Sequence, residues 1–129
     1  MTDERALATE PAVVVGRVYD LALWLLPKVE SFPRPYRATV TQRLMEAALN
    51  FQETLFDAQS RRGEARLACL QAADAHLNKL RLYLRLAHHW QWLNDGQYRH
   101  VSLLVAELGR LLGGWLKQAQ GAGARPAPI

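Results

Sequence analysis

Residues 64–92 read EARLACLQAADAHLNKLRLYLRLAHHWQW, and this stretch decides the fold. Its apolar residues recur in steps of three and four, as they do in a helix that packs against other helices. A helix of this length extends about 40 Å, so it can form one full member of a bundle. We therefore expect a helix over Glu64–Trp92 with its apolar face buried. The recurring positions are Leu67, Leu70, Ala73, Leu77, Leu80, Leu84 and Ala87.

Three further segments show the same helical spacing of apolar residues. They cover residues 12–30, a stretch that begins between Pro35 and Thr39 and ends near Arg61, and a stretch that follows Asn94. Four amphipathic helices joined by short turns pack as an up-down-up-down four-helix bundle, so the expected fold class is all-α. The expected core positions in these three helices are Val14, Val18, Leu21, Leu25, Val29, Val40, Leu44, Ala47, Phe51, Leu55, Val101, Leu104, Val105, Leu108, Leu111, Leu112 and Trp115.

Polar residues mark two of the helix starts. Thr39 with Gln42, and Asn94 with Gln97, have the spacing of a capping box, in which two side chains bond each other's backbone N–H groups. Pro27 should kink the last turn of the first helix or end that helix early, because proline cannot donate a backbone hydrogen bond. These features predict where the bundle turns.

The composition bounds the class of protein. We expect one domain at residues 12–120, between disordered tails at residues 1–11 and 121–129. The first ten residues lack the apolar core of a signal peptide, and no run of about 18 apolar residues could span a membrane. The single cysteine, Cys69, excludes an internal disulfide. A cytoplasmic protein without a membrane partner is expected.

Two of the helices carry a second apolar stripe outside the core face. Such stripes on two helices favour self-association over isolated surface leucines, so we expect the bundle to assemble into a homo-oligomer. The residues of the expected interface are Met45, Leu49, Phe56, Leu82, Leu86 and Trp90.

The outer side of the third helix is basic. The net charge is +4, and residues 61–110 hold eight bases against four acids. On a helix, Asn78, Arg81, Arg85, His88 and Trp92 fall within about 80° of arc, with no acidic residue among them. Bases next to aromatic residues suit a nucleic-acid backbone with its bases stacked nearby. The alternative is a structural network in which carboxylates of the first or second helix pair with these arginines, and the sequence leaves it open.

Catalytic and metal chemistry find little support. None of the four histidines follows a glutamate by three residues, as a di-iron bundle would require, so we expect no metal and no cofactor. Arg81 and His88 lie seven residues apart, and this spacing resembles the Arg-x6-His motif of HEPN ribonucleases, which are also helical bundles. Leu82 stands where that family has a polar residue. A HEPN-like ribonuclease remains an alternative.

Four stretches carry a closer resemblance. YDLALWLLPKVESFPRPYR (19–37), TQRLMEAALN (41–50), KLRLYLRLA (79–87) and GRLLGGWLK (109–117) together resemble the accessory variability determinant (Avd) family of diversity-generating retroelements. That family belongs to the four-helix-bundle proteins that include those encoded in intervening sequences of ribosomal RNA. The resemblance covers about residues 13–118.

The resemblance implies a barrel-shaped homopentamer with no catalytic centre. Its implied partners are the reverse transcriptase of the element and its template RNA, with DNA as a second nucleic acid, and its implied role is support of mutagenic cDNA synthesis. An orphan four-helix-bundle interaction protein is the alternative within the wider family. The residues implied in nucleic-acid or partner binding are Arg81, Arg85, Arg34, Arg37, Arg43 and Arg110, and His88 extends the same face.

Overall fold

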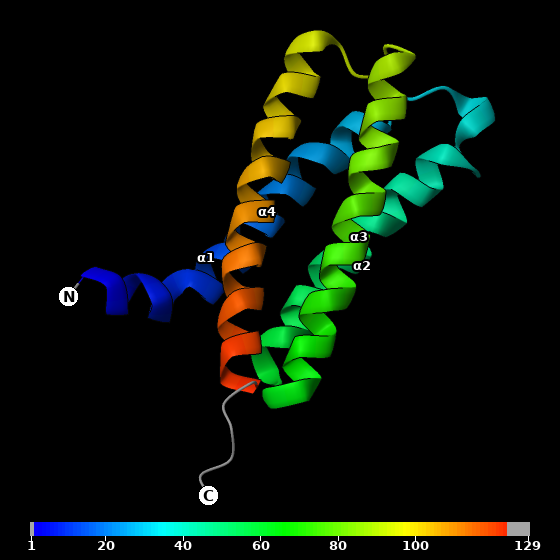
Figure 1. Cartoon of the computed structure of the whole chain (residues 1–129). Coiled ribbons are helices and arrows are strands. Elements are labelled where there is room, and N and C mark those ends of the chain that lie inside the picture. Colours follow the sequence, from blue (N-terminus) through cyan, green and yellow to red (C-terminus); the bar gives the residue numbers. More distant parts are fainter. Residues whose placement is uncertain (1, 124–129) are drawn as a thin grey trace, which may run out of the picture.

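The computed structural model describes the backbone of residues 2–123 and the side chains of residues 12–121, and all regular structure in that part is helical. The elements are α1 (Thr2–Val29), the short 3-10 helix η1 (Arg34–Tyr36), α2 (Val40–Ser60), α3 (Gly63–His89) and α4 (Asp95–Gly123). α1 and α3 each pack on α2 and α4, and successive helices run in opposite directions (Figure 1). The chain has the expected up-down-up-down four-helix bundle.

The core lies where the spacing predicts. Every expected core position is buried except four that lie at the edges of the apolar faces, and those four are half-buried. The largest buried side chains include Phe51 and Trp115. The half-buried positions are Val40, Leu67, Leu104 and Leu111.

The helix boundaries differ from expectation at α1. The helix begins at Thr2 instead of about Ala12, because residues 2–10 are mostly good helix formers. Pro27 is accommodated in the last turn, and α1 ends at Val29. The disorder expected for residues 1–11 and 121–129 stays a prediction, and Met1 and residues 124–129 lie outside the described residues.

One of the two expected capping boxes forms. The Asn94 backbone N–H donates to Gln97 Oε1 at 2.9 Å, and the Gln97 N–H donates to Asn94 Oδ1 at 2.8 Å. At Thr39 the expectation was wrong, because the hydroxyl donates backward to the Tyr36 carbonyl at 3.3 Å and caps no α2 N–H. Asn94 thus fixes the start of α4 with its own side chain.

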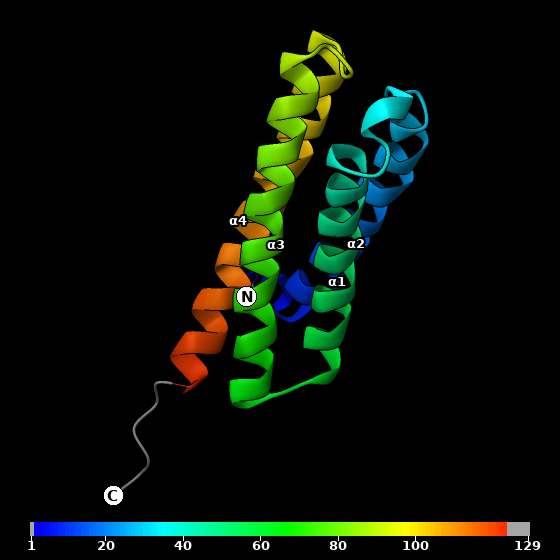
Figure 2. The ribbon, with the colours of Figure 1, turned by 90° about the vertical axis from the view of Figure 1, so that its right-hand side faces the viewer.

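Two loops meet at one end of the bundle. α3 stops at His89 instead of Trp92, and Gln91 adopts a left-handed φ of 59° that turns the chain towards α4. The loops after α1 and after α3 lie at the same end (Figure 2). Aromatic rings join them: Trp92 packs 5.4 Å from Phe32 and 5.0 Å from Tyr36, measured between ring centroids. Trp92 therefore belongs to this loop contact and not to the outer stripe of α3.

At the other end, Arg66 holds the turn between α2 and α3. Its guanidinium donates to the carbonyls of Ala58 and Gln59, at 2.9 and 3.1 Å, and lies over the Trp115 ring. The Ala58 carbonyl also accepts from the Arg61 N–H at 3.4 Å, so Arg66 adds a second bond there and supplies a partner to the Gln59 carbonyl at the end of α2. Arg66 is thus a structural residue. In the part of the chain that is described, no helix is both long and apolar enough to cross a membrane.

Candidate nucleic-acid interface

Arg81 lies between α3 and α4, and does not point straight outward as the helical wheel suggests. Its Nη1 donates to Asn78 Oδ1 at 2.9 Å, and its Nη2 lies directly over Gly109 of α4. A Cβ at position 109 would overlap that Nη2, so the absence of a side chain on Gly109 makes room for the guanidinium. The half-buried Arg81 is held in place by its contacts with both helices.

Arg85 follows one turn later and is exposed. The two arginines border a shallow cavity of about 260 Å³ that Tyr98 and Ser102 of α4 also line. Among the described residues, no carboxylate forms an ion pair with Arg81 or Arg85. The ion pairs found there join Arg17 to Asp20 and Glu107, and His88 to Asp95. Within residues 12–121, the alternative that carboxylates of neighbouring helices neutralise these arginines is therefore not borne out.

His88 is engaged at the junction of α3 and α4. Its ring stacks on Tyr98 with centroids 4.2 Å apart and planes 4° apart, and its Nε2 lies 2.8 Å from Asp95 Oδ1. The hydrogen bond with His88, and then its charge, lower the pKa of Asp95 below the usual 3.8. Arg81 and His88 share a face, but each bonds a different residue of the fold, so their geometry gives the ribonuclease alternative no support.

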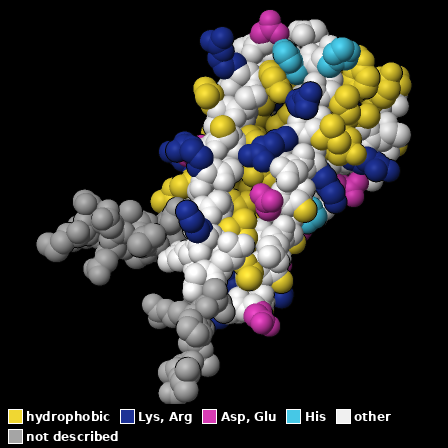
Figure 3. Space-filling model, in the orientation of Figure 1, with side chains coloured by type: hydrophobic (Ala, Val, Ile, Leu, Met, Phe, Trp, Pro, Cys, Tyr) yellow, Lys and Arg dark blue, Asp and Glu magenta, His cyan; other side chains and the backbone are white. Residues whose placement is uncertain are grey.

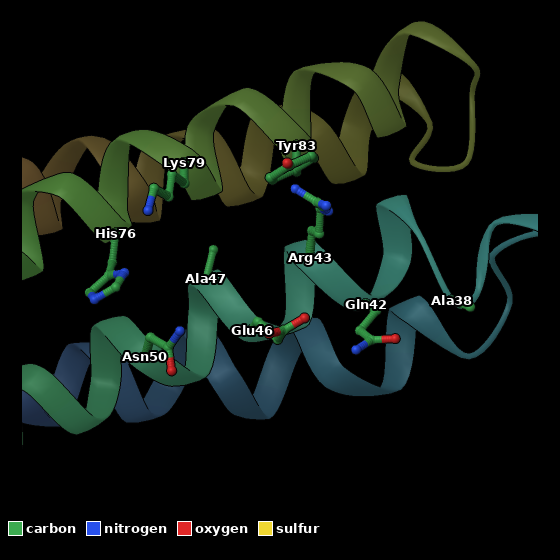
Figure 4. Close-up of a pocket in the computed structure, with 9 residues that line it drawn as sticks. All are labelled: Ala38, Gln42, Arg43, Glu46, Ala47, Asn50, His76, Lys79 and Tyr83. Carbon is green, nitrogen blue, oxygen red and sulfur yellow. The ribbon is translucent and has the colours of Figure 1, made fainter.

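A second basic groove lies between α2 and α3. Figure 4 shows Arg43 of α2 reaching towards Tyr83 of α3, with Lys79 and His76 further along α3. The groove has a volume of about 430 Å³, and Glu46 also lines it. Burial, and then the charge of Lys79, lower the pKa of His76 below 6.5. Sequence reasoning included Arg43 only by resemblance and missed the other residues, although Lys79 and Tyr83 are one turn apart.

The remaining basic candidates are exposed and separate from these grooves. Arg34 and Arg37 lie in and just after η1, and Arg110 lies on α4. Figure 3 shows Lys and Arg side chains along the α3–α4 face, and hydrophobic side chains gathered at the upper right, over the end where the two loops meet. The sequence-predicted residues therefore form several surfaces and not one.

The expected oligomer interface is exposed in part. Leu49, Phe56, Leu82 and Trp90 are exposed, whereas Met45 and Leu86 are half-buried, and whether these residues meet a second copy stays a prediction. Tyr19 and Leu23 of α1 are exposed as well, and neither was among the expected interface residues. Within the described residues, no three His, Cys, Asp or Glu side chains are grouped to hold a metal ion.

Comparison with known proteins decides the family. A family model described as bAvd-like matches residues 12–119. The chain belongs to the bAvd-like family. The resemblance to Avd proteins inferred from the sequence is thereby confirmed, and the match runs from within α1 to near the end of α4.

The solved structures agree with this fold. A crystal structure of a protein of unknown function from the S23 ribosomal protein family, from Bacteroides thetaiotaomicron, superposes with a TM-score of 0.76. The superposition covers 84% of this chain and 98% of that chain, at 14% sequence identity. At that identity the likeness shows a shared fold and nothing more. No curated protein matches this sequence.

Proposed function

We propose that this protein is a non-catalytic accessory protein of a diversity-generating retroelement, which binds RNA and the reverse transcriptase of the element and supports mutagenic cDNA synthesis. Membership of the bAvd-like family supports the retroelement role. The observation that carries the binding role is the pair Arg81 and Arg85, which lie side by side at a cavity with no carboxylate partner among the described residues.

Unpaired arginines suit an anionic partner. A planar guanidinium donates to phosphate oxygens or to a carboxylate in a bidentate way, and Arg81 is already oriented by Asn78 and Gly109. In a homo-oligomer, which we propose to be a pentamer, each copy would repeat the pair. Weak single contacts would then add through multivalency. This arrangement favours RNA binding with modest sequence preference.

RNA binding as a function of salt tests the proposal. Arg81→Ala with Arg85→Ala should weaken binding and reduce the salt slope by about one unit per lost phosphate contact, because fewer counterions are released. Arg61→Ala with Arg62→Ala removes the same charge at the opposite end of the bundle and is the matched control. Arg→Lys at positions 81 and 85 should keep the slope and lose affinity if bidentate contacts matter.

The outcome that contradicts the binding role is a double alanine variant that binds RNA as wild type does. The RNA should also remain intact after incubation, and cleavage that disappears in Arg81→Ala would favour the ribonuclease alternative instead. Repeating the binding measurements with DNA of the same sequence establishes which nucleic acid the protein prefers.

A further inference from the structure

An exposed pair of aromatic rings stands at the end of the bundle. Tyr36 of η1 and Trp90 at the end of α3 have ring planes 16° apart and centroids 6.0 Å apart. Phe32 is buried and Trp92 is half-buried behind them, whereas Tyr36 is 42% and Trp90 is 46% exposed. Joining the two loops accounts for the covered rings, but it leaves the exposed area of Tyr36 and Trp90 without a partner in the chain.

The two segments that carry this pair are basic. The two segments that meet there, residues 28–39 and 85–100, hold five Lys and Arg residues and only two acids. One of those acids, Asp95, already faces His88. Exposed aromatic rings amid cations are typical of surfaces on which single-stranded nucleic acid stacks its bases and neutralises its phosphates. An anionic ligand with flat rings fits both features.

The α2–α3 groove continues from the same place. Lys79 and Tyr83, one turn apart on α3, line this groove on the side that faces α2, and Trp90 follows Tyr83 by seven residues, just after the end of α3. Lys79 and Trp90 are separated by about 16 Å of helix. Arg43 reaches into the groove from α2, and Ala38, two residues after Tyr36, lines its end (Figure 4). The end of the basic groove thus lies two residues along the chain from the aromatic pair.

The cations of the groove have no ion-pair partner in the described part of the chain. Neither Arg43 nor Lys79 forms a salt bridge, although Glu46 lines the same groove. Burial, and then the charge of Lys79, lower the pKa of His76 in the same groove. A phosphate placed between Arg43 and Lys79 would be stabilised by both.

From this geometry we infer that the α2–α3 face binds a single-stranded segment of RNA, with a base stacked on the Tyr36–Trp90 pair and the following phosphates beside Arg43 and Lys79. The inference rests on the proposed RNA-binding function and adds a second site to the Arg81–Arg85 pair. Single strands are favoured because the bases of a duplex are stacked on each other and cannot offer their faces to a protein ring.

Fluorescence anisotropy with a labelled, unstructured RNA of about 15 nucleotides tests the site on the full chain, because single-strand sites of this kind cover about 4–16 nucleotides. Tyr36→Ala with Trp90→Ala should weaken binding at least about fivefold without changing the salt slope, since stacking releases no counterions. Arg43→Ala with Lys79→Ala should weaken binding and lower the slope by about 0.7 per lost phosphate contact. A duplex of the same sequence should be insensitive to the aromatic change.

Control variants separate stacking from folding and assembly. Tyr36→Phe with Trp90→Phe retains rings at both positions and should bind RNA within about threefold of wild type. Only the variant that loses both rings should show the larger fall in RNA affinity. Tyr19→Ala with Leu23→Ala removes two comparably exposed side chains from α1 and should bind as wild type does. Light scattering on each variant records the oligomeric state.

Three results would overturn the inference. The first is wild-type binding by the double alanine variant of the aromatic pair, and the second is equal loss with single-stranded and duplex RNA. The third is loss of the oligomer in that variant, which would assign Trp90 to an interface between copies. In each case sensitivity to Arg81→Ala with Arg85→Ala would leave the proposed function standing. A wild-type protein that binds no RNA would contradict both this inference and the proposed function.

Discussion

Gly109 and Gly113 offer a matched test of the Arg81 contact. Both lie in α4, but a Cβ at position 109 would overlap Arg81 Nη2, whereas a Cβ at position 113 would meet nothing within 4 Å. We therefore expect Gly113→Ala and Gly109→Ala to have different effects on stability. Only Gly109→Ala should alter the position of the guanidinium.

The expected magnitudes follow from helix propensity and one hydrogen bond. Replacing a mid-helix glycine with alanine stabilises by about 0.5–1 kcal/mol, so Gly113→Ala should raise Tm by about 2–5 °C. Gly109→Ala has the same helical gain, but it displaces the end of a flexible side chain and breaks the Arg81–Asn78 bond, a loss of about 0.5–1.5 kcal/mol. Its net effect on the free energy of unfolding should therefore lie between a gain of about 0.5 kcal/mol and a loss of about 1 kcal/mol.

Urea denaturation of both variants measures the difference, and RNA binding of both supplies the functional readout. Gly109→Ala should weaken RNA binding, because the arginine loses its fixed orientation, and Gly113→Ala should not. Equal stabilisation by the two substitutions together with equal RNA affinity would refute the placement of Arg81 over Gly109. If Gly109→Ala unfolds the protein, the Arg81 guanidinium cannot move aside for the new methyl group, and the contact between α3 and α4 is tighter there than we expect.

Three further predictions concern other parts of the bundle. Asn94→Ala should lower the free energy of unfolding by about 1 kcal/mol because it removes the α4 cap, whereas Thr39→Ala should change it by less than about 0.5 kcal/mol, both measured by urea denaturation. The lowered pKa of His76 means that the unfolded chain takes up the proton more readily, so His76 should cost stability as pH falls through about 6.5. Lys79→Gln should raise the pKa of His76 towards 6.5 in an NMR titration and weaken that pH dependence, and an unchanged titration would contradict the contact. Leu82→Glu should dissociate the proposed oligomer while helical circular dichroism persists, since a charge would be buried in the interface; a variant that keeps the wild-type mass in light scattering would place Leu82 outside the interface.

The sequence predicts most of the bundle because the pattern is local. A repeat of three and four residues identifies the buried face of each helix, and the buried positions from Leu70 to Ala87 in α3 follow it. The Asn94–Gln97 box is also local, since both partners lie within one turn. Features of this kind need no knowledge of neighbouring helices.

The site depends on contacts between segments far apart in the chain, and the spacing of apolar residues does not predict such contacts. Arg81 turns towards α4 because Gly109 leaves space there, and His88 is held by Tyr98 and Asp95 across a loop. The helical wheel gives a direction for each side chain but not the neighbour it meets. Trp92 was misplaced for the same reason, because α3 ends at His89 where the loop packing requires it.

Complex formation with a reverse transcriptase tests the central claim most directly. The genes next to its own would first be searched for a reverse transcriptase, and the protein would then be co-expressed with that enzyme and the template RNA of its element and analysed by size-exclusion chromatography. The account predicts co-elution of the two proteins and weakening of the complex by Arg81→Ala with Arg85→Ala, but not by Arg61→Ala with Arg62→Ala. Separate elution of the two proteins at micromolar concentration, or a gene neighbourhood without any reverse transcriptase, would contradict it.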